Sequence, residues 1–377
     1  MDRSGRAARG DDFAIEPLDI IDPVTLQDKA VPPRRWLWEN WMPLRAVTVL
    51  SGDGGTGKSL LALELATACA TDRKFLGQAV MRCKVLVIAC EDERDELHRR
   101  QAWINEGLGI DMADLMDVFW VARAGLDNVM MNFPGDGVGE KTAFFDQVLA
   151  KALDIGAQLI VLDTAADLFG GNENIRPQVR QFINALTGMA LAIDGAVLLL
   201  AHPSQSGKAS GTGESGSTAW NNSVRSRLYL TRPTPEKGEQ EDKDARILSR
   251  QKSNYAQAGA SISLRYRDGV FVATGGEALD DDAWTLNRKR KAEDAFCAGL
   301  EELALKNFRC NAHKGQANYA PKSILEKATS ATGFTHDELE AAMNRLFKKG
   351  RIESVEEGPP SRRRSFIRLL APELGNF

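Results

Sequence analysis

The residues best suited to chemistry lie in a glycine-rich stretch between two apolar runs. In VTVLSGDGGTGKSLLALELA, residues 47–66, the segment from Gly52 to Ser59 has the spacing G-x-x-x-x-G-K-S. Glycines let successive backbone N–H groups turn inward around a phosphate, a lysine can reach the β- and γ-phosphates, and a serine hydroxyl can ligate Mg²⁺. A strand before the loop and a helix after it favour this interpretation over a chance turn. The expected nucleotide-binding residues are Gly52, Asp53, Gly54, Gly55, Thr56, Gly57, Lys58, Ser59 and Leu60.

Carboxylates at two strand ends suit the same chemistry. The apolar run QLIVLDT places Asp163 at its end, and we expect this residue, with Ser59, to hold Mg²⁺, the aspartate through a water molecule. Thr164 follows Asp163, so no glutamate stands beside the aspartate to act as general base. The general base must therefore come from elsewhere. The run KVLVIAC, residues 84–90, is followed by Glu91. Because neighbouring ends of parallel strands lie side by side, a carboxylate there can polarise the water that attacks the terminal phosphate.

The elements that must position these residues alternate along the chain. Apolar runs lie at 47–51, 84–90, 118–122, 158–164 and 196–202, and helical patterns separate them. Apolar strands separated by helices indicate a parallel sheet covered on both faces. Four further runs predict an antiparallel extension of that sheet, at 226–230, 245–251, 260–266 and 269–274. The predicted fold class is therefore α/β, with a mostly parallel twisted sheet.

Seven segments between residues 31 and 275 have a characteristic order and spacing. They read PPRRWLWENWMP, GDGGTGKS, ACEDERDELHRR, LIVLDT, LLAHPS, GSTAWNNSVRSRLYL and RQKSNYAQAG. With them the chain resembles the RepA-like hexameric replicative helicases, RecA-fold proteins of phages and plasmids that carry the label AAA family ATPase. The resemblance implies a RecA-like P-loop ATPase core over residues 31–275, with ATP and Mg²⁺ as ligands.

The resemblance also implies roles for residues around the phosphates. Glu91 would be the general base, and Arg100 on the following helix would support the site. His202, at the end of the central strand, would sense the γ-phosphate and relay its presence to the loop behind it; the plainer alternative is a hydrogen-bonded histidine at a strand end. Lys58 is the fourth residue expected to take part in catalysis within one subunit, beside Glu91, Arg100 and His202.

Two further residues would act across a subunit boundary. The resemblance implies that Arg225, in SVRSR, is an arginine finger and that Lys252, in QKSNY, is its companion. Arg227 and Arg250 are close enough in sequence to exchange roles with them. Surface arginines are usually solvated, but a ring needs a cation supplied in trans.

Two segments of the core have no single interpretation from sequence. The loop 203–217 is rich in glycine and serine and contains Lys208 and Ser210. In a RecA-type ring it would point into the central channel and hold the phosphates of single-stranded DNA, whereas a plain mobile lid has the same composition. The three tryptophans of PPRRWLWENW could stack on adenine or seal a neighbouring subunit.

The C-terminal part of the chain is basic. From Thr285 onward there are 17 Lys/Arg and 12 Asp/Glu, although the whole chain has a formal net charge of −4. Helical patterns at 292–308, 321–333 and 335–350, followed by a hairpin, predict a winged helix-turn-helix, in which Thr335 and Glu338 form a capping box. Helix three and the wing are expected to bind DNA, although such domains also dock proteins. The DNA-binding residues expected here are Arg345, Lys348, Lys349, Arg362, Arg363 and Arg364.

These patterns predict four regions. They are a disordered arm (1–30), the ATPase domain (31–275), a linker (276–290) and the winged helix-turn-helix domain (291–377). No apolar run of transmembrane length and no signal-peptide core is present, so we expect a cytoplasmic protein without membrane contact.

We expect a homo-oligomeric ring, a hexamer, that drives DNA replication as a helicase or translocase on single-stranded DNA. The winged domain would bind duplex DNA or a replication protein. Two alternatives remain open. One is an ATPase that loads or remodels replication or recombination proteins without unwinding; the other is a nucleotide-switched DNA-binding regulator.

Overall fold

The computed structural model describes residues 18–135, 137–202, 218–235, 240–257, 259–274, 283–357, 359 and 363–370. The chain divides into two compact units, Met1–Arg35 and Trp36–Phe377. In the first unit a 3₁₀ turn, Pro23–Leu26, begins after Asp22, whose side chain accepts a hydrogen bond from the Val24 N–H. This turn lies within the region predicted to be a disordered arm.

A nine-stranded sheet dominates the second unit, in the order β14-β13-β12-β11-β3-β10-β8-β4-β5. The six strands from β11 to β5 pair in parallel, and β12, β13 and β14 extend the sheet in antiparallel fashion. The strands are β3 (Ala46–Gly52), β4 (Lys84–Ala89), β5 (Val118–Ala122), β8 (Ala157–Asp163), β10 (Ala196–Ala201), β11 (Ser226–Thr231), β12 (Ala245–Ser253), β13 (Ser261–Arg267) and β14 (Val270–Ala273).

The α/β class and the antiparallel extension are thus confirmed. The run 226–230 was expected in the extension; instead it forms β11, which pairs in parallel with β3. A large, mostly parallel sheet of this kind is consistent with a RecA-like P-loop ATPase.

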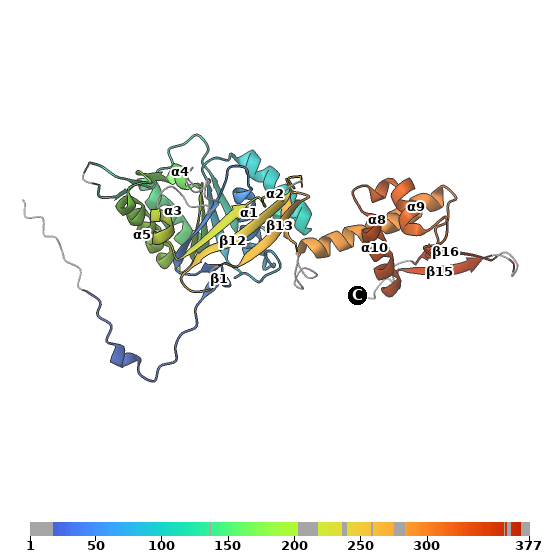
Figure 1. Ribbon diagram of the computed structural model, residues 1–377, viewed down its shortest axis with the longest axis horizontal. Helices are drawn as coiled ribbons and strands as arrows, with labels where there is room; N and C mark the ends of the chain where they lie inside the picture. Colours follow the sequence, from blue (N-terminus) through green and yellow to red (C-terminus); the bar gives the residue numbers. More distant parts are fainter. Residues whose placement is uncertain are drawn as a thin grey trace, which may run out of the picture. The chain divides into compact units, whose positions relative to one another are not determined.

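Helices cover both faces of this sheet (Figure 1). Helices α1 (Lys58–Thr71) and α2 (Arg94–Leu108) pack on one face, and α3 (Ala143–Ile155), α4 (Ala165–Leu168) and α5 (Arg176–Ala192) pack on the other. Successive residues of a strand point to opposite faces. Accordingly Val85 and Val87 enter the core beneath α1, whereas Leu86 and Ile88 enter the core beneath α5. Burial on both faces explains why these runs are apolar throughout.

Short elements complete the α/β domain. Sequence analysis did not predict the small strands or the 3₁₀ turn among them. They are β1 (Trp36–Trp38), β2 (Met42–Pro43), β6 (Met131–Asn132), β7 (Glu140–Lys141), β9 (Phe169–Gly170), the 3₁₀ turn Met112–Asp114 and helix α7 (Thr218–Ser223).

The C-terminal part has its own core, built from three helices and a hairpin. Phe296, Ile324, Leu339 and Leu346 are buried together there. The elements are α8 (Ala283–Leu305), α9 (Ala320–Lys327), the 3₁₀ turn Thr329–Ala331, α10 (His336–Lys348), β15 (Ile352–Glu357) and β16 (Arg364–Leu369). The predicted capping box of Thr335 and Glu338 is present at the start of α10. None of the helices in the described residues is long and apolar enough to span a bilayer.

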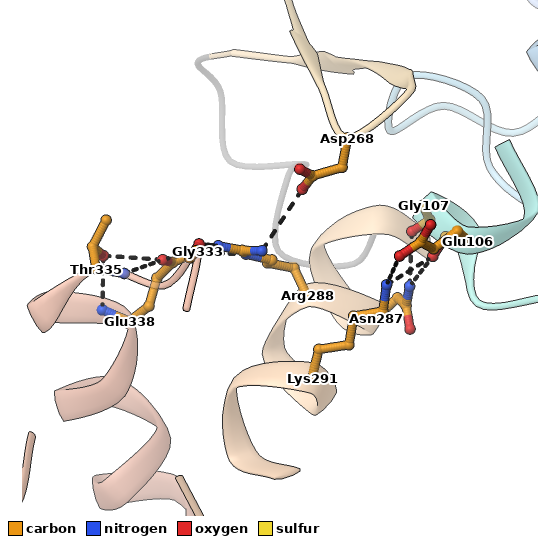
Figure 2. Close-up of polar contacts among 9 residues, drawn as sticks. All are labelled: Glu106, Gly107, Asp268, Asn287, Arg288, Lys291, Gly333, Thr335 and Glu338. Atoms are coloured by element: carbon orange, nitrogen blue, oxygen red, sulfur yellow. Dashed lines mark hydrogen bonds and ion pairs between the residues drawn. The ribbon is translucent and has the colours of Figure 1, made fainter. Parts of the chain in front are cut away.

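Helix α8 starts inside the segment 276–290 that the sequence predicted to be a linker. Trp284 is buried in the core beneath α1, and Asn287 donates hydrogen bonds of 2.9 Å to the carbonyls of Glu106 and Gly107, at the end of α2. Figure 2 shows Arg288 between Asp268 and the first turn of α10, where its Nε lies 2.8 Å from Glu338. One continuous helix therefore joins the α/β domain to the C-terminal core.

Candidate active site

The phosphate loop has the backbone that its glycines predict. β3 ends at Gly52, and α1 begins at Lys58, with Gly57 as its N-cap at φ 99°. Gly55 also has a positive φ, of 71°. A Cβ on Gly52 would lie 2.5 Å from the Leu230 carbonyl oxygen. Positive φ and close backbone approach both favour glycine, and the free N–H groups of the first turn of α1 make its start an anion site.

The Lys58 amine lies within the loop. Its Nζ is 2.8 Å from the carbonyl oxygen of Gly52 and 3.2 Å from that of Asp53. It is also 3.4 Å from Nδ1 of His202, which follows the last residue of β10. The structure therefore brings together the predicted phosphate-binding lysine and the predicted sensor histidine, although they are far apart in sequence.

The predicted magnesium residues meet at the carboxyl end of β8. Asp163 is 7% exposed and accepts a hydrogen bond from the Ser59 side chain. Burial, and then the neighbouring carboxylates of Glu91 and Asp92, raise the pKa of Asp163 to about 6. Hydroxyl and carboxylate oxygens suit Mg²⁺, and a divalent cation would offset this concentration of negative charge. These residues therefore fit a magnesium ion.

Glu91 reaches this group through the pairing of β4 with β8. Ala89 pairs with Asp163 in parallel register, and Glu91 follows two residues later with an exposed side chain. The expected proximity of the two carboxylates is present: Glu91 lies close enough to Asp163 to raise its pKa.

Arg100 supports the turn after β4. Its Nη1 lies 2.5 Å from Asp92 Oδ2, and its Nε lies 3.0 Å from Glu96 Oε1. The sequence did not single out Asp92, whose carboxylate links Arg100 to the turn that carries Glu91.

Three cations gather where β11 begins and β12 ends. Arg227 pairs with Lys252 across the two strands, and Arg225 directly precedes β11. Burial, and then the charges of Arg225 and Arg227, lower the pKa of the Lys252 amine. We call Arg225, Arg227 and Lys252 the cation cluster.

Arg250 has a local role in the structure. Its Nη1 donates to the Asn40 carbonyl at 2.6 Å, its Nε donates to the Gln257 carbonyl at 3.0 Å, and its guanidinium lies over the Trp41 ring. The side chain is buried. These contacts hold the Arg250 guanidinium within its own subunit.

The second and third tryptophans of the PPRRWLWENW segment are core residues. Trp38 and Trp41 are buried and stack on each other with ring centroids 4.7 Å apart. The Trp38 Nε1 donates to the side chain of Gln78 at 2.9 Å. Their packing within the subunit leaves neither ring free to stack on adenine or to seal a neighbour.

The DNA-binding residues expected on α10 differ in their surroundings. Arg345 was expected to bind DNA, but its Nε lies 2.7 Å from the carboxylate of Glu293, a buried residue of α8. Lys349 lies 2.7 Å from the other oxygen of the same carboxylate. Burial raises the pKa of Glu293, but the hydrogen bonds from Lys349 and Arg345 outweigh it and lower the pKa below its ordinary value. Lys348 has an exposed side chain.

The other expected DNA contacts are only partly described. Arg364 begins β16 with an exposed side chain, and Arg363 lies 3.4 Å from Glu356 in an exposed ion pair. Lys208, Ser210 and Arg362 lie outside the described residues, so their roles stay predictions.

Residues far from the loop in sequence also contact it, and sequence analysis missed them. Arg246 of β12 donates from Nε to the Thr56 carbonyl at 2.9 Å. The Phe271 ring lies against Gly57, and its backbone N–H donates to Glu64 of α1 at 2.7 Å. One signal was available: Glu64 is the single charged residue in the apolar run LLALELATACA, residues 60–70.

A comparison with known protein families agrees with the phosphate loop. A family model described as an AAA domain matches residues 15–208, slightly more than half of the 377 residues. Among solved structures, the chain is similar to a KaiC-like protein from the hyperthermophilic archaeon Pyrococcus horikoshii, with 16% identity and a TM-score of 0.45. That match covers 64% of this chain and 100% of the other.

Proposed function

The chain belongs to the AAA domain family, and on that premise we propose that it is a Mg²⁺-dependent ATP hydrolase acting as a ring-forming DNA helicase or translocase in phage or plasmid replication. The observation that carries the proposal is that the phosphate loop and the cation cluster lie on neighbouring strands of one sheet. The phosphate loop lies at one end of β3, and the cation cluster lies towards the other end of β11, the strand beside it.

Hydrolysis would use residues of one subunit for binding and for water activation. The loop N–H groups and Lys58 bind the phosphates, and Glu91 accepts a proton from the attacking water. Mg²⁺ held by Ser59 and Asp163 would neutralise charge on the β- and γ-phosphate oxygens. His202, whose Nδ1 lies 3.4 Å from the Lys58 Nζ, would respond to the γ-phosphate.

Arg225 lies too far from the loop of its own subunit to complete that site. Leu230 pairs with Gly52, whereas Arg225 comes five residues earlier in the chain, directly before β11. At about 3.3 Å per residue the separation is about 16 Å, longer than an arginine side chain. In a ring of identical subunits the cation cluster would reach the γ-phosphate of a neighbour, as an arginine finger does.

DNA binding would use two regions. The segment 203–217 would hold single-stranded DNA in the channel. The three helices α8, α9 and α10 with the hairpin β15–β16 would act as a winged helix-turn-helix for duplex DNA or a replication protein. An Ile367 N–H to Cys310 carbonyl hydrogen bond, which adds a third chain segment to the hairpin, supports this assignment.

The test compares ATP turnover, with and without single-stranded DNA, in the wild type and in Glu91→Gln. We expect DNA to stimulate the wild type, and Glu91→Gln to lose about 10²–10⁴-fold in turnover while still binding nucleotide. Asp95→Asn is the matched control, because Asp95 is an exposed carboxylate in the first turn of the same α2. Native turnover by Glu91→Gln would contradict the catalytic assignment.

A strand-displacement assay tests the helicase role separately. We expect the wild type, supplied with ATP and a forked duplex, to release the displaced strand. Turnover without displacement would instead favour a loader or remodeller, and sequence-specific duplex binding with negligible turnover would favour a nucleotide-switched regulator.

A further inference from the structure

The phosphate loop is enclosed by strands that lie outside the matched family region. β12 and β14 come after residue 208, and both place side chains on the loop or on the first turn of α1. The three residues involved are Glu64, Arg246 and Phe271, and all three are buried.

Phe271 packs on the residue that starts α1. A Cβ added to Gly57 would lie 2.6 Å from both Cε2 and Cζ of the Phe271 ring, so the ring tip is in direct contact with the N-cap glycine. Gly57 has a φ of 99°, a conformation that sets the direction in which the loop enters the helix. A rigid ring against this position limits how far the loop can move outward.

Arg246 orients the peptide before Gly57. Its Nε–H donates to the Thr56 carbonyl at 2.9 Å. In a trans peptide the carbonyl and the following N–H point in opposite directions. The hydrogen bond therefore directs the Gly57 N–H away from β12, as phosphate binding by the loop requires. Nη1 of Arg246 donates to the carbonyls of Lys243 and Ala245 at 2.6 and 2.7 Å, which fixes the guanidinium itself.

Glu64, on α1, holds the backbone of Phe271 by a hydrogen bond. Its Oε1 accepts the Phe271 N–H at 2.7 Å, and the Glu64 side chain is 5% exposed. Burial raises the pKa of Glu64 well above its ordinary value. A buried carboxyl in an apolar helix face is costly, and here it satisfies the backbone N–H of Phe271.

We propose that Phe271, Arg246 and Glu64 are positioning residues for the phosphate loop, so that nucleotide affinity depends on the antiparallel strands β12 and β14. The inference rests on the proposed function, because it takes the loop to be the nucleotide site. It predicts that loosening this support weakens nucleotide binding more than it slows the chemical step.

The test measures the Kd of a fluorescent ADP analogue, with Mg²⁺ and with EDTA, together with KM, kcat and the midpoint of thermal unfolding. For Phe271→Ala we expect Kd to rise about tenfold or more, which corresponds to about 1.4 kcal/mol, with kcat changed about threefold at most. The ratio to wild type should persist in EDTA, because Phe271 contacts the loop backbone and not the magnesium residues.

Val272→Ala is the matched control. Val272 is buried in the same core and on the same strand as Phe271. The side-chain atoms nearest to Gly57, however, belong to Phe271. We expect the Kd of Val272→Ala to stay within about twofold of wild type, with a smaller loss of thermal stability than in Phe271→Ala. Equal Kd values for Phe271→Ala and Val272→Ala would overturn the proposal.

A second pair of variants keeps the test decisive if Phe271→Ala does not fold. Glu64→Gln retains an oxygen acceptor for the Phe271 N–H and should bind nucleotide normally, whereas Glu64→Leu removes the acceptor and should weaken binding. Equal affinity in this pair would also overturn the proposal. A wild type that binds no nucleotide would instead refute the proposed function.

Discussion

Mixing two inactive variants tests whether the cation cluster acts between subunits. Lys58→Ala removes the phosphate-binding amine but leaves Arg225 in place. Arg225→Ala keeps the phosphate loop but lacks the guanidinium. Because Arg225 lies about 16 Å along the strand from its own loop, only a neighbouring subunit can combine an intact loop with an intact arginine.

The size of the effect follows from random assembly. Alone, Arg225→Ala should lose about 10³–10⁵-fold in turnover, the range typical of an arginine finger. In an equimolar mixture, a loop from one variant faces an arginine from the other at about one interface in four. The mixture should therefore recover about a quarter of wild-type turnover, and the recovered rate should follow the product of the two mole fractions.

The assay is phosphate release over a series of mixing ratios. The control mixes Arg225→Ala with the double variant Lys58→Ala/Arg225→Ala, in which no chain supplies the arginine, so activity should stay at the level of Arg225→Ala alone. Subunit exchange is followed by fluorescence transfer between labelled chains. Exchange without recovery of turnover would refute the shared-site argument.

Three further predictions concern single contacts. The pKa of Glu64 is raised in the folded state, so the stability linked to its protonation is present at low pH and is lost as pH rises through the folded value. Glu64→Gln should therefore raise the thermal midpoint at neutral and alkaline pH and leave it unchanged near pH 4; a pH-independent difference would contradict this. Lys348→Ala should reduce the salt dependence of duplex binding by about one unit of slope. Arg345→Ala should chiefly lower the free energy of unfolding, by about 1–3 kcal/mol, because its buried partner Glu293 loses one of its two cations. Salt titration and denaturant unfolding separate the two effects. Asn287→Ala should lower the free energy of unfolding by about 1–3 kcal/mol, because two carbonyls at the end of α2 lose their donor. Chemical denaturation measures this change. An unchanged denaturation midpoint would show that the Asn287 hydrogen bonds do not stabilise the contact between α8 and α2.

The sequence predicted the site where the signal was local. The phosphate loop, Asp163 and Glu91 each follow an apolar strand, and strand ends of a parallel sheet meet at one edge. The same pattern predicted the sheet and its helices. The loop contacts of Arg246 and Phe271 had no such signal, because each lies about 190 residues or more from the loop and resembles an ordinary strand residue.

The C-terminal boundary was hidden by composition. The polar segment GGEALDDDAWTLNRKR suggested a linker, yet α8 begins at Ala283 because Trp284 and Asn287 find partners on the α/β domain. Similarly, Arg345 lies on the polar face of α10, and the sequence alone could not reveal that Glu293 of the facing helix pairs with it.

Because α8 is one continuous helix, a tilt at its start displaces its far end. Glu91 and Asp92 precede the start of α2, and Asn287 holds its end (Figure 2). A tilt of about 10° at Asn287 would carry Leu305, about 27 Å further along the helix, sideways by about 5 Å. A small rotation of α2, transmitted through Asn287, would thus move the far end of α8 by several ångströms.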